Sequence, residues 1–395
     1  MPAISRWWLA RATAGGSLDA RRELPSLTPL RGIAAMAVLF YHSSFLAYHF
    51  GGGASPGICR RGYLAVDLFF VLSGFVLTHV YGSRLAANRD WPALGRFLWA
   101  RFCRIYPAAL FTTAVYVVKH VIGQFDMPAG ISFKTQLIAA LFLFQVPWLD
   151  NIIINGPSWS ISAEWYAYLL FPFVVPIIGR LKGRAAAATC IALLVVMAID
   201  HTIASQEQQR ASGWGALLRA WPEFMVGILA YRFYSEGHFR RVWGRDATFI
   251  ALLVAIAIAC LADAPDGVIV VLLVPLLLAS VGNSGKTTGM LNARPLRWLG
   301  DISYSVYIFQ MTAFAIPVTF AGVLVASGWG GYRFQAITIL TAIGCGALVH
   351  RCIDVPMRVA LRGLFNRVVG LAAFRRRRRA AALPTAPTAV SARDL

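Results

Sequence analysis

Long apolar runs alternate with short polar segments along most of the chain. A helix needs about 20 apolar residues to cross a bilayer. Ten segments are candidates for such a helix, at roughly 30–50, 62–81, 102–121, 159–179, 185–203, 214–233, 247–263, 267–282, 302–325 and 334–353. One further apolar segment, 135–148, is shorter and runs into Pro147, so we expect it to be re-entrant or packed at a surface. The pattern therefore predicts an all-α polytopic membrane protein with about ten transmembrane helices.

The composition supports this prediction, because 58% of the 395 residues are hydrophobic and only 14% are charged. A soluble domain usually carries about 25% charged residues. Lysine and arginine indicate the orientation, since they collect on the cytoplasmic side of membrane proteins. If the N-terminus is cytoplasmic and 135–148 does not cross, 30 of the 37 Lys and Arg residues lie inside. We therefore predict that both termini are cytoplasmic.

The net charge of +20 does not indicate a nucleic-acid-binding protein, because the basic residues are scattered between apolar runs. The six cysteines form no CxxC pair, so neither a disulfide framework nor a metal site is expected. We divide the chain into a cytoplasmic N-terminal segment (1–26), a membrane domain (27–360) and a basic tail (361–395). Five consecutive arginines and an Ala/Pro/Thr stretch predict that the tail is disordered and binds anionic lipid head groups.

Ionisable side chains inside the apolar runs are the first candidates for function. Each costs at least about 2.5–3.5 kcal/mol at the centre of a membrane helix. Arg31 and His42 both lie in the first run. Their spacing corresponds to about three helical turns, so both side chains share one helix face and His42 lies ~16 Å beyond Arg31. A structural histidine bonded to a neighbouring helix is the alternative that this pair leaves open.

Two carboxylates are expected at a depth similar to that of His42. Asp67 lies about one turn into the second run, and Ser160 and Glu164 share a helix face at the start of the fourth. A carboxylate beside a histidine fixes its tautomer and raises its basicity, which produces a general base. We therefore expect Glu164 or Asp67 to orient His42, although a structural bond between helices would also place carboxylates there.

Arginines gather at the start of the third run, in the stretch RFLWARFCRIYP, where Arg101 and Arg104 share a helix face. Cytoplasmic charge alone explains arginines at this position. Arg104, however, precedes Ile-Tyr-Pro in apolar surroundings, where an unpaired charge is costly. Guanidinium groups bind phosphate with two parallel hydrogen bonds, so this pair indicates an anionic, phosphorylated donor.

A polar stripe enters the ninth run at GDISYSVYIFQ, where Ser303, Tyr307 and Gln310 fall on one helix face. Such a stripe either lines a cavity or bonds adjacent helices, and the sequence leaves both open. The remaining histidines lie at or near loop boundaries and are expected to be structural: His49, His79, His120, His201, His238 and His350.

Seven stretches, in this order, resemble the acyltransferase family 3 of integral membrane O-acyltransferases: LTPLRGIAAMAVLFYH, DLFFVLSGFVLT, RFCRIYP, PSWSISAEWYAYLLFP, RAWPEFMVGILA, LGDISYSVYIF and CIDVPMR. The resemblance covers about 27–360. It implies O-acyl transfer in a bacterial inner membrane, as in polysaccharide acetylases and macrolide acylases. Residues matching Arg31, His42, Arg101 and Arg104 are functionally required in that family, and Glu164 matches its glutamate after Trp-Ser-x-Ser.

The chain departs from the family pattern at two positions. The family's SYSLYLWH usually ends in histidine, and Gln310 occupies that position here, so we expect no second catalytic histidine. Asp354 stands where glutamate is common.

These observations predict a membrane O-acyltransferase that moves an acyl group, most simply acetyl, from acyl-CoA to a hydroxyl of a saccharide, glycoconjugate or secondary metabolite. His42 is the expected general base, and Glu164 and Asp67 are its expected catalytic partners. Acyl-CoA is expected as a co-substrate, bound through its phosphates by Arg31 and the arginine pair of the third run, and no permanently bound cofactor is expected.

Further residues are expected to bind the substrate: Trp159, Ser160, Ser303, Tyr307 and Gln310. The competing interpretation is a proton-coupled transporter or lipid flippase that uses His42 and Glu164 as a proton relay. It predicts substrate movement without turnover of acyl-CoA.

Overall fold

The computed structural model describes residues 24–50, 57–87, 90–203, 211–238, 240–365 and 367. Most of the predicted N-terminal segment 1–26 and of the tail 361–395 lies outside these residues. The helices are α2 (Leu27–His49), α3 (Gly57–Arg60), η2 (Gly62–Leu64), α4 (Ala65–Leu77), η3 (Thr78–Gly82), α5 (Ser83–Ala87), α6 (Trp91–Val121), α7 (Phe133–Leu141), α8 (Ser158–Arg180), α9 (Gly183–Ile203), α10 (Gly213–Glu236), α11 (Arg240–Trp243), α12 (Asp246–Leu261), α13 (Asp266–Gly282), α14 (Lys286–Leu291), α15 (Arg294–Thr319), α16 (Ala321–Ala326), α17 (Tyr332–Val349) and η5 (His350–Asp354).

The predicted fold class is confirmed, because each of the ten predicted spans coincides with a helix or with consecutive helical segments, and the described residues contain no strand. Within the part of the chain that the structure describes, six helical segments are long and apolar enough to cross a membrane. The helices α12 and α13 are also apolar but are shorter than these segments, with 16 and 17 residues. The helices α6 and α10 are long, with 31 and 24 residues, and carry more charge.

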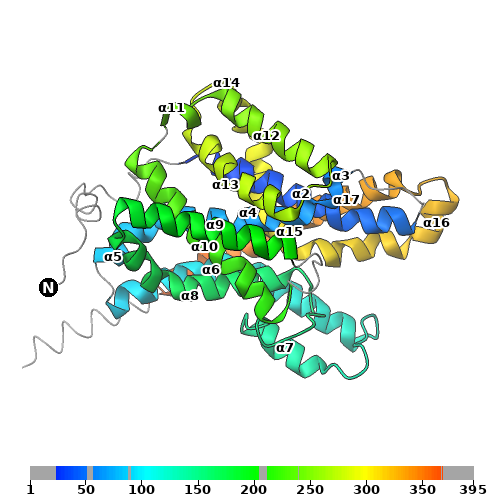
Figure 1. Cartoon of the computed structure of the whole chain (residues 1–395). Coiled ribbons are helices and arrows are strands. Elements are labelled where there is room, and N and C mark those ends of the chain that lie inside the picture. Colours follow the sequence, from blue (N-terminus) through cyan, green and yellow to red (C-terminus); the bar gives the residue numbers. More distant parts are fainter. Residues whose placement is uncertain are drawn as a thin grey trace, which may run out of the picture.

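The shorter apolar segment 135–148 does not form a spanning helix. Its helix α7 has nine residues, about 14 Å of length, and an irregular chain follows to the start of α8. Figure 1 shows α7 on one side of the bundle and α12 on the opposite side. This agrees with the expectation that the segment packs at a surface or re-enters.

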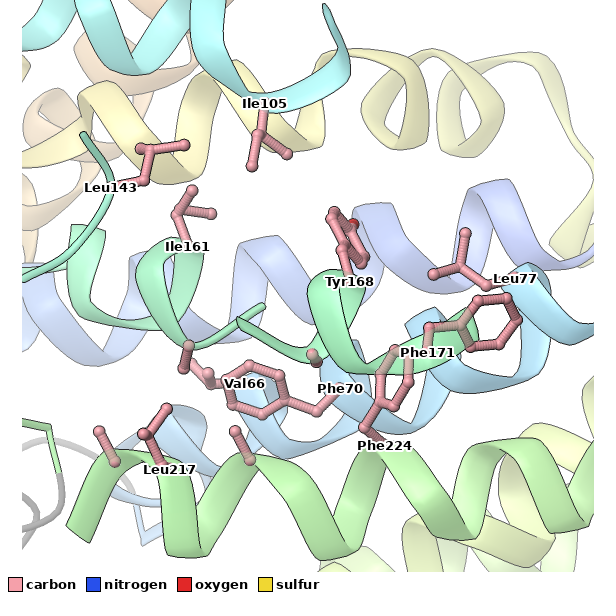
Figure 2. Close-up of a cluster of buried hydrophobic side chains, with 14 of the residues drawn as sticks. Val66, Phe70, Leu77, Ile105, Leu143, Ile161, Tyr168, Phe171, Leu217 and Phe224 are labelled. Carbon is pink, nitrogen blue, oxygen red and sulfur yellow. The ribbon is translucent and has the colours of Figure 1, made fainter. Parts of the chain in front are cut away.

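The helices α2, α4, α8, α10 and α15 build the interior of the bundle. Helix α4 packs against α10 and α2, while α15 packs against α2 and α17. The largest cluster of buried apolar side chains draws on all five of these helices and on α6. Figure 2 shows part of it, with Val66, Phe70 and Leu77 of α4 facing residues of α8 and α10.

Glycines allow two of these helix pairs to approach closely, as small residues do in membrane bundles. A Cβ atom on Gly227 would lie 2.1 Å from the carbonyl oxygen of Val71, and one on Gly74 would lie 2.0 Å from that of Phe224. The backbones of α4 and α10 are therefore in direct contact. Between α2 and α15, a Cβ atom on Gly32 would lie 2.6 Å from the backbone nitrogen of Gly300. These contacts fix the position of α4 relative to α10 and of α2 relative to α15.

We expect Gly227→Ala to destabilise the protein, because its new methyl group would force α4 away from α10. Overpacking of this kind costs typically about 1–3 kcal/mol. The matched control is Gly344→Ala in α17, where a Cβ atom would have open space. That substitution should be neutral or stabilising, because alanine restricts the unfolded chain. Thermal unfolding of the detergent-solubilised proteins measures both effects, and equal melting temperatures for the two variants would contradict the prediction.

Candidate active site

A cavity of about 110 Å³ lies between α2, α4, α6, α8 and α15. Its walls are largely apolar, and Figure 2 shows several of the residues that form them, among them Val66, Ile105, Ile161 and Tyr168. The polar side chains of the lining come from all five helices. We call the part lined by Arg31, Arg101 and Arg104 the basic end, and the part lined by Ser160 and Tyr307 the distal end.

Three predicted donor-binding residues, Arg31, Arg101 and Arg104, line the basic end together. The two other arginines and Glu164 are among the charged groups that act on Arg31. The guanidinium of Arg31 makes no hydrogen bond or ion pair with the described residues, and its side chain is half-buried. The structure therefore brings together three residues that the sequence placed on two separate helices.

Aromatic rings and one carboxylate contact the two arginines of α6 that line the cavity. Arg101 donates from Nη2 to the hydroxyl of Tyr81 over 3.1 Å, and its guanidinium carbon lies 5.1 Å from the centre of that ring. The guanidinium of Arg104 lies 5.4 Å from the ring centre of Tyr304, and its Nη1 is 3.9 Å from Oδ2 of Asp354. Arg101 keeps a buried Nε donor without a partner, so its binding capacity is not exhausted by the protein.

Asp354 is a buried carboxylate that contacts Arg104 from outside the cavity lining. Its side chain is fully buried, and Arg358 donates to the same Oδ2 atom that faces Arg104. Nδ1 of His350 lies 3.5 Å from that atom. The family that the sequence resembles commonly has glutamate at this position. Asp354 thus keeps a carboxylate in contact with Arg104.

Glu164 faces the same cavity as the arginines. Its Oε1 atom accepts hydrogen bonds from the hydroxyl of Tyr168, over 2.5 Å, and from that of Ser73. It is the one carboxylate of the cavity lining, against three guanidinium groups. The lining is therefore net positive, and an anion bound there would be stabilised by charge and by hydrogen bonds.

Part of the polar stripe of α15 lines the cavity, and Tyr307 also bonds the adjacent α8 region, so both alternatives that the sequence left open apply. Ser303 and Tyr307 are lining residues, as is Ser160 of α8. The hydroxyls of Ser160 and Tyr307 lie 2.7 Å apart at the distal end. One turn further along α15, Gln310 is 1% exposed and donates from Nε2 to the carbonyl oxygen of Tyr307 over 3.0 Å.

His42 is half-buried on α2 and does not belong to the cavity lining. Its polar neighbour is the side chain of Gln310, so the stripe of α15 leads from the distal end of the cavity to the histidine. The expected contact with a carboxylate is not found, because neither Glu164 nor Asp67 forms an ion pair or hydrogen bond with His42 among the described residues.

Asp67 belongs to a separate buried network. Arg219 of α10 donates from Nε and Nη2 to its two carboxylate oxygens, over 2.6 and 2.9 Å. His201 of α9 places Nε2 3.2 Å from Oδ1 of Asp67 and 3.5 Å from Oε1 of Glu223. The guanidinium of Arg219 also lies 5.2 Å from the ring centre of Trp159. All four ionisable side chains are at most 2% exposed.

This network corrects two sequence-based assignments. Asp67 pairs with Arg219 rather than with His42, and Trp159 packs on the same arginine instead of lining the cavity. His201 lies two residues before the end of α9, is 2% exposed and bonds to Asp67, which agrees with the structural role expected for it near a loop boundary. The sequence did carry a signal of this network. Arg219 and Glu223 are four residues apart within one apolar run and therefore share a helix face.

The group of Asp67, His201 and Glu223 has donor atoms within 4.8 Å of one another, as a metal site would require. The guanidinium of Arg219, however, already contacts both oxygens of Asp67. A cation beside that guanidinium would be repelled. We interpret the group as an ion-pair network that ties α4, α9 and α10 together.

Comparison with known proteins identifies the family. The model of an acyltransferase domain family matches residues 24–350. The chain belongs to this family. It is 29% identical to the acyltransferase MdmB of Streptomyces mycarofaciens over 85% of this chain and 91% of that protein. It is 25% identical to a putative peptidoglycan O-acetyltransferase, YrhL, of Bacillus subtilis over 85% of this chain and 55% of that protein.

The peptidoglycan O-acetyltransferase OatA of Listeria monocytogenes is 23% identical over 86% of this chain. The chain spans about half the length of OatA and of the Bacillus protein. No solved structure matches the chain. Family membership makes this protein an acyltransferase enzyme with membrane helices, and the resemblance on which we predicted its class is confirmed.

Proposed function

We propose that this acyltransferase moves an acyl group, most simply acetyl, from acyl-CoA to a hydroxyl of a saccharide, glycoconjugate or secondary metabolite. The observation that carries the proposal is the net positive cavity below His42, in which three arginines face one carboxylate. CoA is an anion whose phosphates suit guanidinium groups. Its thioester lies at the end of an extended arm, so phosphates at the basic end leave the thioester pointing into the cavity.

The geometry of α2 supports the same arrangement. Arg31 lines the basic end, and His42 follows on the same helix face about 16 Å further along. The polar groups of α15 lie between the two. The positive-inside distribution of Lys and Arg supports a basic end that faces the cytoplasm, from which the donor would enter.

The reaction requires one base and one electrophile. Nε2 of His42 accepts the proton of the acceptor hydroxyl while the hydroxyl oxygen attacks the thioester carbonyl carbon. The carbon–sulfur bond then breaks, and the CoA thiolate takes the proton back from the imidazolium. The products are an ester and free CoA thiol, so that atoms and charge balance without a further reactant.

Relatives support an acceptor with hydroxyl groups, because OatA is named as a peptidoglycan O-acetyltransferase and YrhL as a putative one. The family assignment also favours acyl transfer over the transporter interpretation. Membrane vesicles that contain the protein, incubated with acetyl-labelled CoA, test the proposal. We expect label to leave CoA and to appear in an alkali-labile ester. If label stays on CoA while a substrate moves with protons, the transporter interpretation is correct.

We expect Arg101→Gln to raise the KM for acetyl-CoA by about 10-fold or more, because a hydrogen bond to a charged group contributes about 1.5–3 kcal/mol. Its effect on kcat should be smaller, since the phosphates do not react. The matched control is Arg84→Gln, an exposed arginine outside the cavity.

A donor without the CoA phosphates sharpens this experiment. With S-acetylpantetheine, the wild-type protein and the Arg101→Gln variant should have the same KM, because the phosphate contact is missing in both. An unchanged difference between the two proteins on S-acetylpantetheine would show that Arg101 does not bind phosphate.

A further inference from the structure

The register of two parallel helices places Gln310 opposite His42. Helices α2 and α15 meet where Gly32 faces Gly300, and His42 and Gln310 each follow their glycine by ten residues. Further along both helices, Leu39 packs in one buried cluster with Val306. Equal offsets in parallel helices give equal heights, so the glutamine lies level with the imidazole.

The atoms at this point complement each other. Nδ1 of His42 and Oε1 of Gln310 are both buried and have no hydrogen-bond partner in the described part of the chain. The Nε2 amide of Gln310 donates to the carbonyl oxygen of Tyr307 over 3.0 Å, and this bond fixes which end of the carboxamide is nitrogen. The oxygen is therefore the end that remains for the neighbouring imidazole.

We infer that Gln310 is the residue that orients His42, by accepting a hydrogen bond from Nδ1–H and leaving Nε2 unprotonated toward the acceptor hydroxyl. This inference rests on the proposed function, in which Nε2 is the base. An amide oxygen only accepts hydrogen bonds, so its contact with Nδ1 permits one tautomer of the neutral ring. Gln310 thereby does for His42 what the sequence led us to expect of Glu164 or Asp67.

A neutral partner differs physically from the expected carboxylate. A carboxylate beside the ring would stabilise the imidazolium and hold its proton. The amide selects the tautomer without adding a charge to the apolar interior, where an uncompensated charge is costly. Glutamine at this position, in place of the histidine common in the family, therefore combines orientation of the ring with little electrostatic cost.

Two substitutions of Gln310 separate orientation from packing. Gln310→Met keeps the length of the side chain and removes the acceptor, and Gln310→Glu keeps an acceptor for Nδ1–H. In membrane vesicles with acetyl-labelled CoA, we expect Gln310→Met to lower the rate per folded protein at saturating donor about 10–100-fold, the range found for partners that orient histidine ligands. The KM for acetyl-CoA should stay unchanged, and Gln310→Glu should retain more activity than Gln310→Met.

The matched control is Gln335→Met. Gln335 of α17 is also buried against α2, and it donates from Nε2 to the carbonyl oxygen of Phe40 and to the hydroxyl of Ser43, over 3.3 and 3.2 Å. Its loss should lower stability without changing the rate per folded protein. A rate of Gln310→Met equal to that of Gln335→Met would overturn the inference.

A spectroscopic measurement tests the inference independently of activity. In protein labelled with ¹⁵N-histidine, the nitrogen chemical shifts distinguish Nδ1–H from Nε2–H, and loss of the signal in His42→Asn assigns it. We expect Nδ1–H in the wild-type protein and in Gln310→Glu, and Nε2–H in Gln310→Met. The same tautomer in all three proteins would overturn the inference, whereas a wild-type protein that leaves label on CoA would overturn the proposed function instead.

Discussion

His42→Ala is expected to lower kcat for acyl transfer about 10²–10⁴-fold, the usual contribution of a general base. Without the imidazole, the acceptor hydroxyl must attack while it still carries its proton. The three arginines of the cavity remain in place at the basic end, so the KM for acetyl-CoA should change little. Initial rates of label transfer from acetyl-CoA in membrane vesicles, normalised to the amount of folded protein, measure both constants.

The control for this substitution lies on the same helix. His49 follows His42 by seven residues on α2, and its side chain is exposed. His49→Ala should therefore leave both kcat and KM unchanged. A His42→Ala protein that folds and transfers label at the wild-type rate would show that the histidine is structural and that another group takes the proton.

Asp67→Asn is expected to destabilise the protein by about 3–5 kcal/mol, because removal of one charge leaves its buried partners uncompensated. Arg219 and His201 both face this carboxylate and are 2% exposed. Activity per folded protein should stay near the wild-type value, since the network lies apart from the cavity lining. Thermal unfolding in detergent measures the stability, and label transfer at a permissive temperature measures the activity.

Two further variants make this prediction specific. Asp263→Asn removes the carboxylate of an exposed ion pair with Arg60, in which both side chains are more than half exposed, and should cost about 0–1 kcal/mol. In a double-mutant cycle, Asp67→Leu together with Arg219→Met should cost less than the sum of the single changes. If Asp67→Asn instead left stability intact and lowered kcat, Asp67 would act on His42 after all.

The sequence predicted those features of the candidate site that depend on the spacing of residues along a single helix. The spacing of Arg31 and His42 along α2, of Arg101 and Arg104 along α6, and of the stripe along α15 follows from 3.6 residues per turn. The structure confirms that the arginines and part of the stripe share a cavity. Whether His42 is the base remains a prediction, for which the experiments above are designed.

The partners of these residues were not predictable in the same way. The sequence predicts that Asp67, Glu164 and His42 lie at a similar depth in the membrane. Depth along a helix, however, does not determine which neighbouring helix a side chain contacts. Asp67 meets Arg219 and His201 because glycines bring α4 into backbone contact with α10. Glu164 turns instead toward Ser73 and Tyr168.

The sequence by itself determined the all-α membrane architecture, the positions of the helices along the chain and the side chains that share a face. These properties follow from local periodicity and from the cost of exposing polar groups to lipid. Only the tertiary structure decided that the arginines of α2 and α6 converge, that Asp67 is bound in an ion-pair network, and that Gln310 lies beside His42. Those contacts depend on lateral packing and helix register, which small residues such as Gly32 and Gly300 set through close backbone approach.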